Sequence, residues 1–142
     1  MAAAQVVQVL GGPGVLKKVR TEEDLRERLR EGLPYAAFEA LRVAFGLSLK
    51  DLSIVLAVPE RTLARRKVQR RLRPDESDRL VRLAWIAAYA EEVLGGRAKA
   101  ADWLRTPNRA LGTDPPVARL DTDLGTRQIE AVLGRIAHGV YS

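Results

Sequence analysis

The sequence predicts an all-α fold with a helix-turn-helix core and a small helical module at its C-terminus. Apolar residues recur at helical spacing in successive segments of the chain. Residues that favour helix starts, such as Thr21 and Ser48, stand before several of these segments, and glycines such as Gly95 follow them. No strand pattern or internal repeat stands out, so helices are expected throughout the chain.

The first predicted helix follows a glycine-containing lead-in. Thr21 can act as its N-cap, and the acidic residues 22–24 occupy the first turn, where the helix dipole favours negative charge. Leu25 and Leu29 share one face of this helix, and Gly32 ends it. The segment therefore predicts a short helix with one apolar face.

Two further helices are expected directly after the first. One runs from about Pro34 to Phe45 and ends before Gly46. Its apolar anchors are expected to be Phe38, Leu41, Val43 and Phe45. In the other helix, Ser48 and Asp51 form a pair like a capping box. The buried stripe of that helix is expected to be Leu49, Leu52, Val55 and Leu56.

The next helix begins at a proline and is strongly basic. Pro59 suits the first position of a helix, because proline has no N–H group to leave unpaired there. The helix from Pro59 to about Lys67 is expected to bury Leu63. Its remaining surface carries Arg61, Thr62, Arg65 and Arg66. Two short helices joined by a tight turn, the second of them basic, form a helix-turn-helix pattern.

This basic helix is expected to end or bend near Val68. If it continued, Leu63 and Leu72 would lie on opposite sides of it, at about 100° of rotation per residue. A connecting segment then carries three arginines, namely Arg70, Arg71 and Arg73. Such a segment can reach a DNA backbone independently of the helix.

The positive charge of the chain is concentrated in this motif. Residues 60–73 hold seven Lys and Arg residues against one acidic residue, an excess equal to the net charge of +6 of the whole chain. Because phosphate contacts release counterions, this local excess indicates a polyanionic partner such as DNA. A solvated basic helix face or a membrane-surface patch is the alternative interpretation.

A long helix is expected from Pro74 to Leu94, with Gly95 and Gly96 after its end. Its residues are apolar almost all round, which favours a central scaffold over a binding groove. A short helix from Ala98 to Leu104, a loop, and a final helix from about Asp121 to Ala137 complete the chain. These last elements are expected to form a separate module.

The elements predict three regions: an N-terminal arm at 1–20, a helix-turn-helix domain for DNA binding and dimerisation at 21–95, and a C-terminal module at 96–142. Two-fold DNA sites require two helix-turn-helix units about one helical turn apart, so a homodimer is expected. The long helix or the apolar segment from Ala2 to Leu10 could supply the dimer interface.

Several classes of function are not expected. The chain has no cysteine and one histidine, His138, which excludes cysteine nucleophiles and disulfides and argues against a structural zinc site. Its carboxylates are spread along helix starts, so neither an enzyme nor a metal or cofactor is expected. The longest apolar run, Leu83 to Ala90, is far shorter than the roughly 20 residues that cross a bilayer. With no positive leader at its start, the chain is expected in the cytoplasm.

Four strings of residues in a set order carry a resemblance to a known family. They are Arg61-Thr62-Leu63-Ala64-Arg65-Arg66-Lys67, Glu76-Ser77-Asp78-Arg79-Leu80, Ala101-Asp102-Trp103-Leu104 followed by Pro107-Asn108-Arg109-Ala110-Leu111-Gly112, and the ending Leu133 to Ser142. From about Val9 to the C-terminus, the chain resembles the antitoxins of the Xre/MbcA/ParS type with a C-terminal toxin-binding domain, the partners of RES-domain toxins. The segment 114–117 departs from the family, which usually has a more apolar Pro-Leu pair there.

The resemblance implies the antitoxin of a type II toxin–antitoxin system. Such an antitoxin neutralises a RES-domain toxin, an NAD-consuming enzyme, and represses the operon that encodes both proteins. The resemblance assigns binding of double-stranded operator DNA to Arg61, Thr62, Arg65, Arg66 and Lys67, with Arg70 and Arg71 as backbone contacts. It assigns toxin binding to Trp103, Arg109, Ile136, His138, Tyr141 and Ser142.

Some of the C-terminal assignments have a plainer interpretation. A tryptophan such as Trp103 is found more often in a core than at a recognition surface, and a charged His138 is favoured at the end of a helix in any case. Tyr141 and Ser142 are either a frayed end or a tail that enters a partner's pocket, and the resemblance favours the tail. The alternative function is a stand-alone helix-turn-helix regulator whose C-terminal module binds an effector or self-associates.

Overall fold

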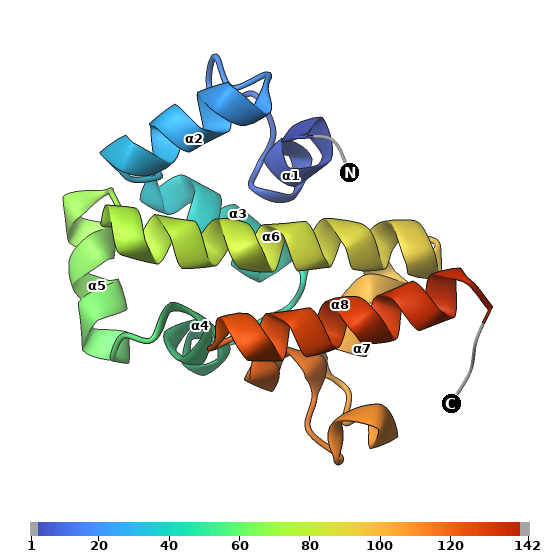
Figure 1. The fold of residues 1–142 in the computed structure, drawn as a ribbon. Helices are drawn as coiled ribbons and strands as arrows, with labels where there is room; N and C mark the ends of the chain where they lie inside the picture. The colour runs from blue at the N-terminus through green and yellow to red at the C-terminus, as the bar shows by residue number, and fades with distance from the viewer. Residues whose placement is uncertain (1–2, 140–142) are drawn as a thin grey trace.

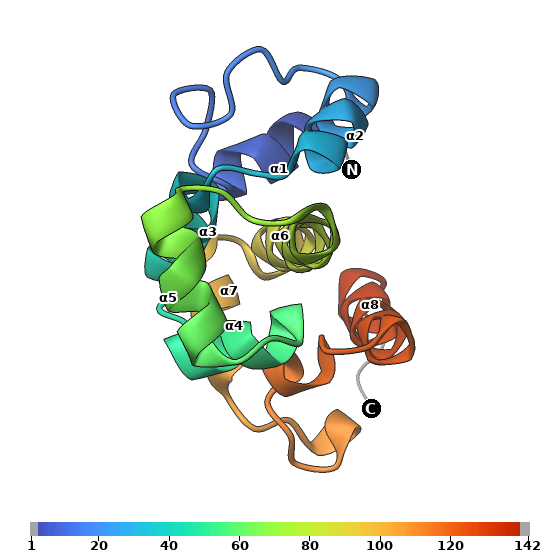
Figure 2. The same ribbon diagram turned by 90° about the vertical axis from the view of Figure 1, so that its left-hand side faces the viewer.

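A long central helix, α6 (Pro74–Leu94), organises the structure, a computed structural model that describes residues 3–139. The other elements are α1 (Ala3–Val9), α2 (Glu22–Glu31), α3 (Tyr35–Ala44), α4 (Leu49–Leu56), α5 (Glu60–Gln69), α7 (Arg97–Arg105), the 3-10 helices η1 (Arg109–Leu111) and η2 (Pro116–Arg119), and α8 (Asp123–Ala137). In Figure 1, α1 and α2 lie on one side of α6 and α8 runs along the other. The view along α6 in Figure 2 shows α3, α4 and α5 on a third side. The described residues form helices and no strand, which confirms the predicted all-α class.

α6 is buried on most of its sides because other helices pack around it. It contacts α1, α2, α4, α7 and α8. Its buried apolar residues are Leu80, Val81, Leu83, Ala84, Ile86, Ala87, Ala88 and Ala90. Pro74 stands in its first turn, and Gly95 follows its end with a φ of 87°, which glycine adopts without strain. The prediction of a central scaffold with these bounds is confirmed.

Two helix starts have capping boxes: one at Thr21, which was predicted as an N-cap, and one at the predicted pair Ser48 and Asp51. The Asp24 N–H donates to the Thr21 hydroxyl over 3.0 Å, and the Thr21 N–H donates to the Asp24 carboxylate over 3.1 Å. In the same way, the Asp51 N–H donates to the Ser48 hydroxyl over 3.0 Å, and the Ser48 N–H donates to the Asp51 carboxylate over 2.9 Å. Both pairs satisfy backbone donors that a helix start would otherwise leave open.

Three local expectations are wrong. Pro59 is the N-cap of α5, not its first residue, with an extended ψ of 154°. Val43 is 65% exposed, because it lies about 200° around the helix from buried Leu41, on the opposite face of α3. Leu49 is 39% exposed, since it is the first residue of α4 and lies at the outer end of that helix.

The predicted N-terminal arm is a packed part of the fold. α1 contacts α3 and α6. Its apolar stripe is buried, at Ala3, Val6, Val7, Val9 and Leu10. Because the chain itself covers this stripe, the suggestion that it supplies a dimer interface is corrected.

The C-terminal elements share one hydrophobic core with the helix-turn-helix segment. α7 and α8 both pack on α6, and η2 packs on α4. The C-terminal residues buried in this core include Leu104, Leu111, Val117, Leu120, Ile129 and Leu133. The predicted boundary at residues 95 and 96 therefore does not divide the hydrophobic core, which includes residues from both sides of it. In the described part of the chain, no helix combines the length and the apolar character needed to cross a membrane.

Candidate functional site

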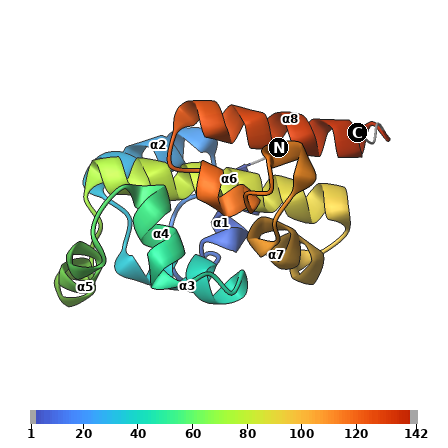
Figure 3. The ribbon, with the colours of Figure 1, turned by 90° about the horizontal axis from the view of Figure 1, so that it is seen from below.

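The helix-turn-helix is formed by α4 and α5, which meet at a tight turn. Ala57 ends α4 in the left-handed region, at φ 57° and ψ 43°. The Val58 N–H donates to the Ser53 carbonyl over 3.1 Å, and the Ser53 hydroxyl donates back to the Val58 carbonyl over 2.6 Å. These bonds fix the direction in which α5 leaves α4. Seen from below in Figure 3, α5 lies at a corner of the molecule beside α4.

The outer face of α5 and the segment after it carry a group of exposed cations. This group, the basic surface, consists of Arg61, Arg65, Lys67, Arg70 and Arg71. None of these side chains forms an ion pair with a carboxylate of the described residues. Thr62 is half-buried beside them, and Leu63 is buried below as predicted. The surface therefore presents unneutralised positive charge to solvent.

Backbone hydrogen bonds hold the segment after α5 against the rest of the fold. α5 ends at Gln69, close to the predicted end near Val68, and Arg70 turns the chain with a φ of 64°. The Tyr35 N–H donates to the Arg70 carbonyl over 3.1 Å, and the Leu72 N–H donates to the Leu33 carbonyl over 2.9 Å. The segment is therefore bonded to the rest of the fold, and its expected contacts with a DNA backbone stay a prediction. Backbone bonds to Leu33 and to the first residue of α3 hold the backbone of this segment in place.

Arg66 does not belong to the exposed group, which corrects its predicted place on the surface. It is 7% exposed and pairs with Glu76 through two hydrogen bonds, Nε to Oε1 at 2.8 Å and Nη2 to Oε2 at 3.0 Å. Hydrogen bonding to the Glu76 carboxylate raises the pKa of Arg66 above its ordinary value. The sequence signal was the spacing: Arg66 follows buried Leu63 by three residues and so shares its face of the helix.

The predicted C-terminal site residues are spread over three elements. Trp103 lies half-buried on α7 and packs against the core, in line with its plainer interpretation. Arg109 is exposed at the start of η1. Ile136 is half-buried near the end of α8, and His138 is exposed at the C-cap of that helix. Tyr141 and Ser142 lie outside the described residues.

Arg119, which sequence reasoning missed, ties the loop of Arg109 to α8. Its guanidinium donates to the Leu111 carbonyl over 2.6 Å, to Gln128 over 2.8 Å and to Asp114 over 3.3 Å. A pocket of about 200 Å³ lies beside it, lined by Ala110, Leu111, Arg119, Gln128, Ala131, Val132 and Arg135. The loop and the outer face of α8 therefore form one continuous surface.

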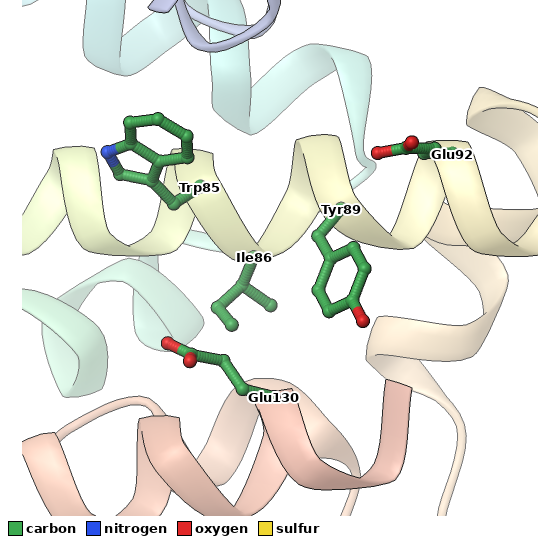
Figure 4. A pocket seen from close by; sticks show the side chains of 5 residues that line it. All are labelled: Trp85, Ile86, Tyr89, Glu92 and Glu130. Atoms are coloured by element: carbon green, nitrogen blue, oxygen red, sulfur yellow. The ribbon is translucent and has the colours of Figure 1, made fainter. Parts of the chain in front are cut away.

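A second surface lies along α6, where the partly exposed side chains of Trp85 and Tyr89 line pockets shared with α8 and α2. Figure 4 shows a pocket of about 460 Å³ there, lined by Trp85, Ile86, Tyr89, Glu92 and Glu130. A neighbouring pocket of about 640 Å³ shares Trp85 and Glu130 and extends to α2. In the described residues, no three His, Cys, Asp or Glu side chains gather closely enough to hold a metal ion.

Comparison with known families accounts for both halves of the chain. The family described as "Antitoxin Xre-like helix-turn-helix domain" matches residues 24–84. The family described as "Antitoxin Xre/MbcA/ParS C-terminal toxin-binding domain" matches residues 89–139. The first match covers α4, α5 and the basic surface, and the second covers the end of α6 and all later elements of the described chain.

Three similar proteins carry the name "Antitoxin Xre". One from Yersinia enterocolitica is 28% identical over 120 residues, which cover 83% of this chain and 81% of that protein. One from Photorhabdus laumondii is 30% identical over 116 residues, covering 80% and 78% respectively. One from Pseudomonas putida is 43% identical over 83 residues, covering 58% of this chain and 52% of that protein.

Proposed function

The chain belongs to the Xre/MbcA/ParS-type antitoxins, and from this premise we propose that it neutralises a RES-domain toxin and represses the operon encoding both proteins. The proposal of DNA binding rests on the basic surface on the outer face of α5. The proposal of toxin binding rests on the match of residues 89–139 to a toxin-binding domain. The cytoplasm is the location that suits both proposed partners.

In the proposed DNA complex, α5 is the recognition helix. Arg61 and Arg65 lie on its exposed face, where a guanidinium can form two hydrogen bonds with a guanine edge. Arg70 and Arg71 follow the helix on a fixed backbone and suit contacts with phosphates, which position a protein without reading sequence. Thr62 and Lys67 complete the contact set. A homodimer would place two such helices on a two-fold site.

In the proposed toxin complex, the contacts come from the region 96–142. Arg109 and His138 offer exposed polar groups, and Ile136 and Trp103 offer partly exposed apolar surface. The resemblance adds the chain end at residues 141 and 142 as a tail that enters the toxin. Binding of such a tail would block an NAD-consuming site directly.

The experiment that tests this function is co-expression with the product of the neighbouring gene. We expect the two proteins to co-purify and the complex to leave cellular NAD intact, whereas the partner alone depletes it. Deleting residues 141 and 142 should weaken inhibition at least about tenfold and leave DNA binding unchanged. Full inhibition by the deleted chain would contradict the tail proposal. A neighbour that neither binds this chain nor consumes NAD would contradict the toxin assignment.

A further inference from the structure

A buried ion pair joins the recognition helix to the central helix. The side chains of Arg66 and Glu76 are 9% and 2% exposed, and two parallel hydrogen bonds of 2.8 and 3.0 Å connect them. A guanidinium and a carboxylate in this bidentate arrangement are coplanar and directional. An ammonium group is a point charge and would let the two side chains rotate relative to each other. The two parallel bonds instead fix the orientation of α5 relative to α6.

The same pair also holds both ends of the connecting segment. The third guanidinium nitrogen of Arg66 donates to the Gln69 side chain over 3.1 Å, at the last turn of α5. The Arg73 N–H donates to the Glu76 carboxylate over 2.9 Å. Ser77, also buried, accepts the Leu33 N–H and donates to the Arg73 carbonyl, both over 2.8 Å. The basic surface is thus mounted on a backbone that is anchored at the start of α6.

We propose that Arg66 and Glu76 are positioning residues for DNA recognition and that Arg66 does not contact DNA. This inference rests on the proposed DNA binding by α5. Arg66 could reach a phosphate only by breaking a buried ion pair, which would leave the Glu76 carboxylate desolvated without a partner. The pair instead keeps Arg61 and Arg65 at the angle that base-edge hydrogen bonds require.

The positioning role affects affinity for the operator and not affinity for unrelated DNA. Base-edge contacts depend on the placement of a side chain to within about 0.5 Å, whereas affinity for phosphates depends mainly on the number of positive charges. Weakening the pair should therefore lower affinity for the operator and spare affinity for unrelated DNA. A direct contact by Arg66 predicts the opposite, because a freed guanidinium would add charge at the interface.

The variant that tests this is Glu76→Gln, which has nearly the same volume and keeps an oxygen that can accept the Arg73 N–H. Binding is measured to the duplex upstream of the gene and to an unrelated duplex of the same length, with the fold checked by circular dichroism. We expect operator affinity to fall at least about tenfold and unrelated affinity to change less than about threefold. Unchanged or higher operator affinity would overturn the positioning role.

A second variant and a matched control complete the test. Arg66→Lys keeps the charge but loses the two parallel bonds, and we expect the same loss of preference for the operator. A lysine that retained full operator affinity would overturn the inference. Glu91→Gln removes a 2.9 Å ion pair with Arg97 at the opposite end of α6, and it should leave both affinities unchanged.

Amide hydrogen exchange tests the positioning without DNA. Glu76→Gln should speed exchange in residues 60–73 at least about tenfold while exchange in α8 stays as in the wild type. Equal exchange in both proteins would refute the positioning role, whatever the DNA result. If the wild type shows no preference for the upstream duplex, the proposed repression fails instead, so the two failures are distinguishable.

Discussion

Adjacent residues of α5 have opposite environments, and this determines what each can do. Arg65 is exposed on the outer face, whereas Arg66 is buried against Glu76. The sequence predicted the outward direction of Arg61 and Arg65 because both lie away from buried Leu63 on the helix. It did not predict the burial of Arg66. The spacing from Leu63 places Arg66 near the buried face, but only the contact with Glu76, distant in the sequence from Leu63, shows that its charge is neutralised there.

Replacing Arg65 by alanine should weaken operator binding by about 1–3 kcal/mol, because one base-edge contact is lost. Arg71→Ala should weaken binding to all duplexes and lower the slope of log affinity against log salt by about 1, since a phosphate contact is lost. Fluorescence anisotropy titrations at several salt concentrations measure both effects. Arg97→Ala is the control, because Arg97 follows the C-terminal end of α6, about 30 Å along that helix from the end next to the basic surface. Unchanged binding by both variants would refute the assignments.

Gly125 is buried in the first turns of α8 for a steric reason. A Cβ atom there would lie 1.9 Å from the Arg119 carbonyl oxygen, so alanine would force η2 away from the helix. We expect Gly125→Ala to lower the free energy of unfolding by about 1–3 kcal/mol. Gly134→Ala, in the same helix, meets only the Tyr89 hydroxyl at 3.7 Å and should be neutral or stabilising. Thermal melts of the two variants compare them directly, and equal stabilities would contradict the steric argument.

At the scale of elements, local chemistry specified where helices begin and end. The bounds of α6 follow from Pro74 and Gly95, and the starts of α2 and α4 follow from their capping boxes. The packing of one element against another was harder to predict from the sequence. The order of apolar residues in α3 does not predict that Val43 is exposed to water. The local sequence also does not predict that the loop after α7 forms two 3-10 helices around Arg119. Such features depend on neighbours distant in the sequence.

The start of α2 should make stability depend on acid. The N–H groups of Arg20 and Thr21 donate to Asp24 and hold the pKa of its carboxyl below the ordinary value of 3.8. Because the folded-state pKa is the lower one, this stabilisation is present above pH 3.8 and is lost as the pH falls through the folded pKa. The melting temperatures of wild type and Asp24→Asn should therefore differ at about pH 6 and converge as the pH falls below the folded-state pKa of Asp24. Asp102→Asn is the control, since Asp102 is exposed and caps no helix start. A constant difference would refute this account.

At the scale of the molecule, the two proposed activities share one scaffold. α6 carries the anchor of the recognition helix at its start and the packing surface of α7 and α8 along its length. The division into regions 21–95 and 96–142 remains a proposal about function, since packing does not separate them. A ligand that binds either region stabilises the same folded state, so each partner should raise the melting temperature of the whole chain.

A chain truncated after residue 95 should not fold by itself. The truncation removes large apolar residues that the intact protein buries, namely Leu104, Leu111, Val117, Leu120, Ile129, Val132 and Leu133. Burial of a Leu, Ile or Val side chain contributes about 1.5–3 kcal/mol, so together they contribute on the order of 10 kcal/mol or more. This is comparable to the roughly 5–15 kcal/mol of net stability of a typical protein. The truncation would also expose the α6 face that α7 and α8 now cover.

The full chain should then unfold in one transition, with the same midpoint by circular dichroism and by tryptophan fluorescence. Trp85 reports on the part of α6 that borders α2 and α8, and Trp103 reports on α7. Fluorescence of Trp85→Phe and Trp103→Phe variants separates the two signals. A cooperative transition of the 1–95 fragment near the full-length midpoint would show that the core is divided, because only a separate core could keep that stability without α7 and α8.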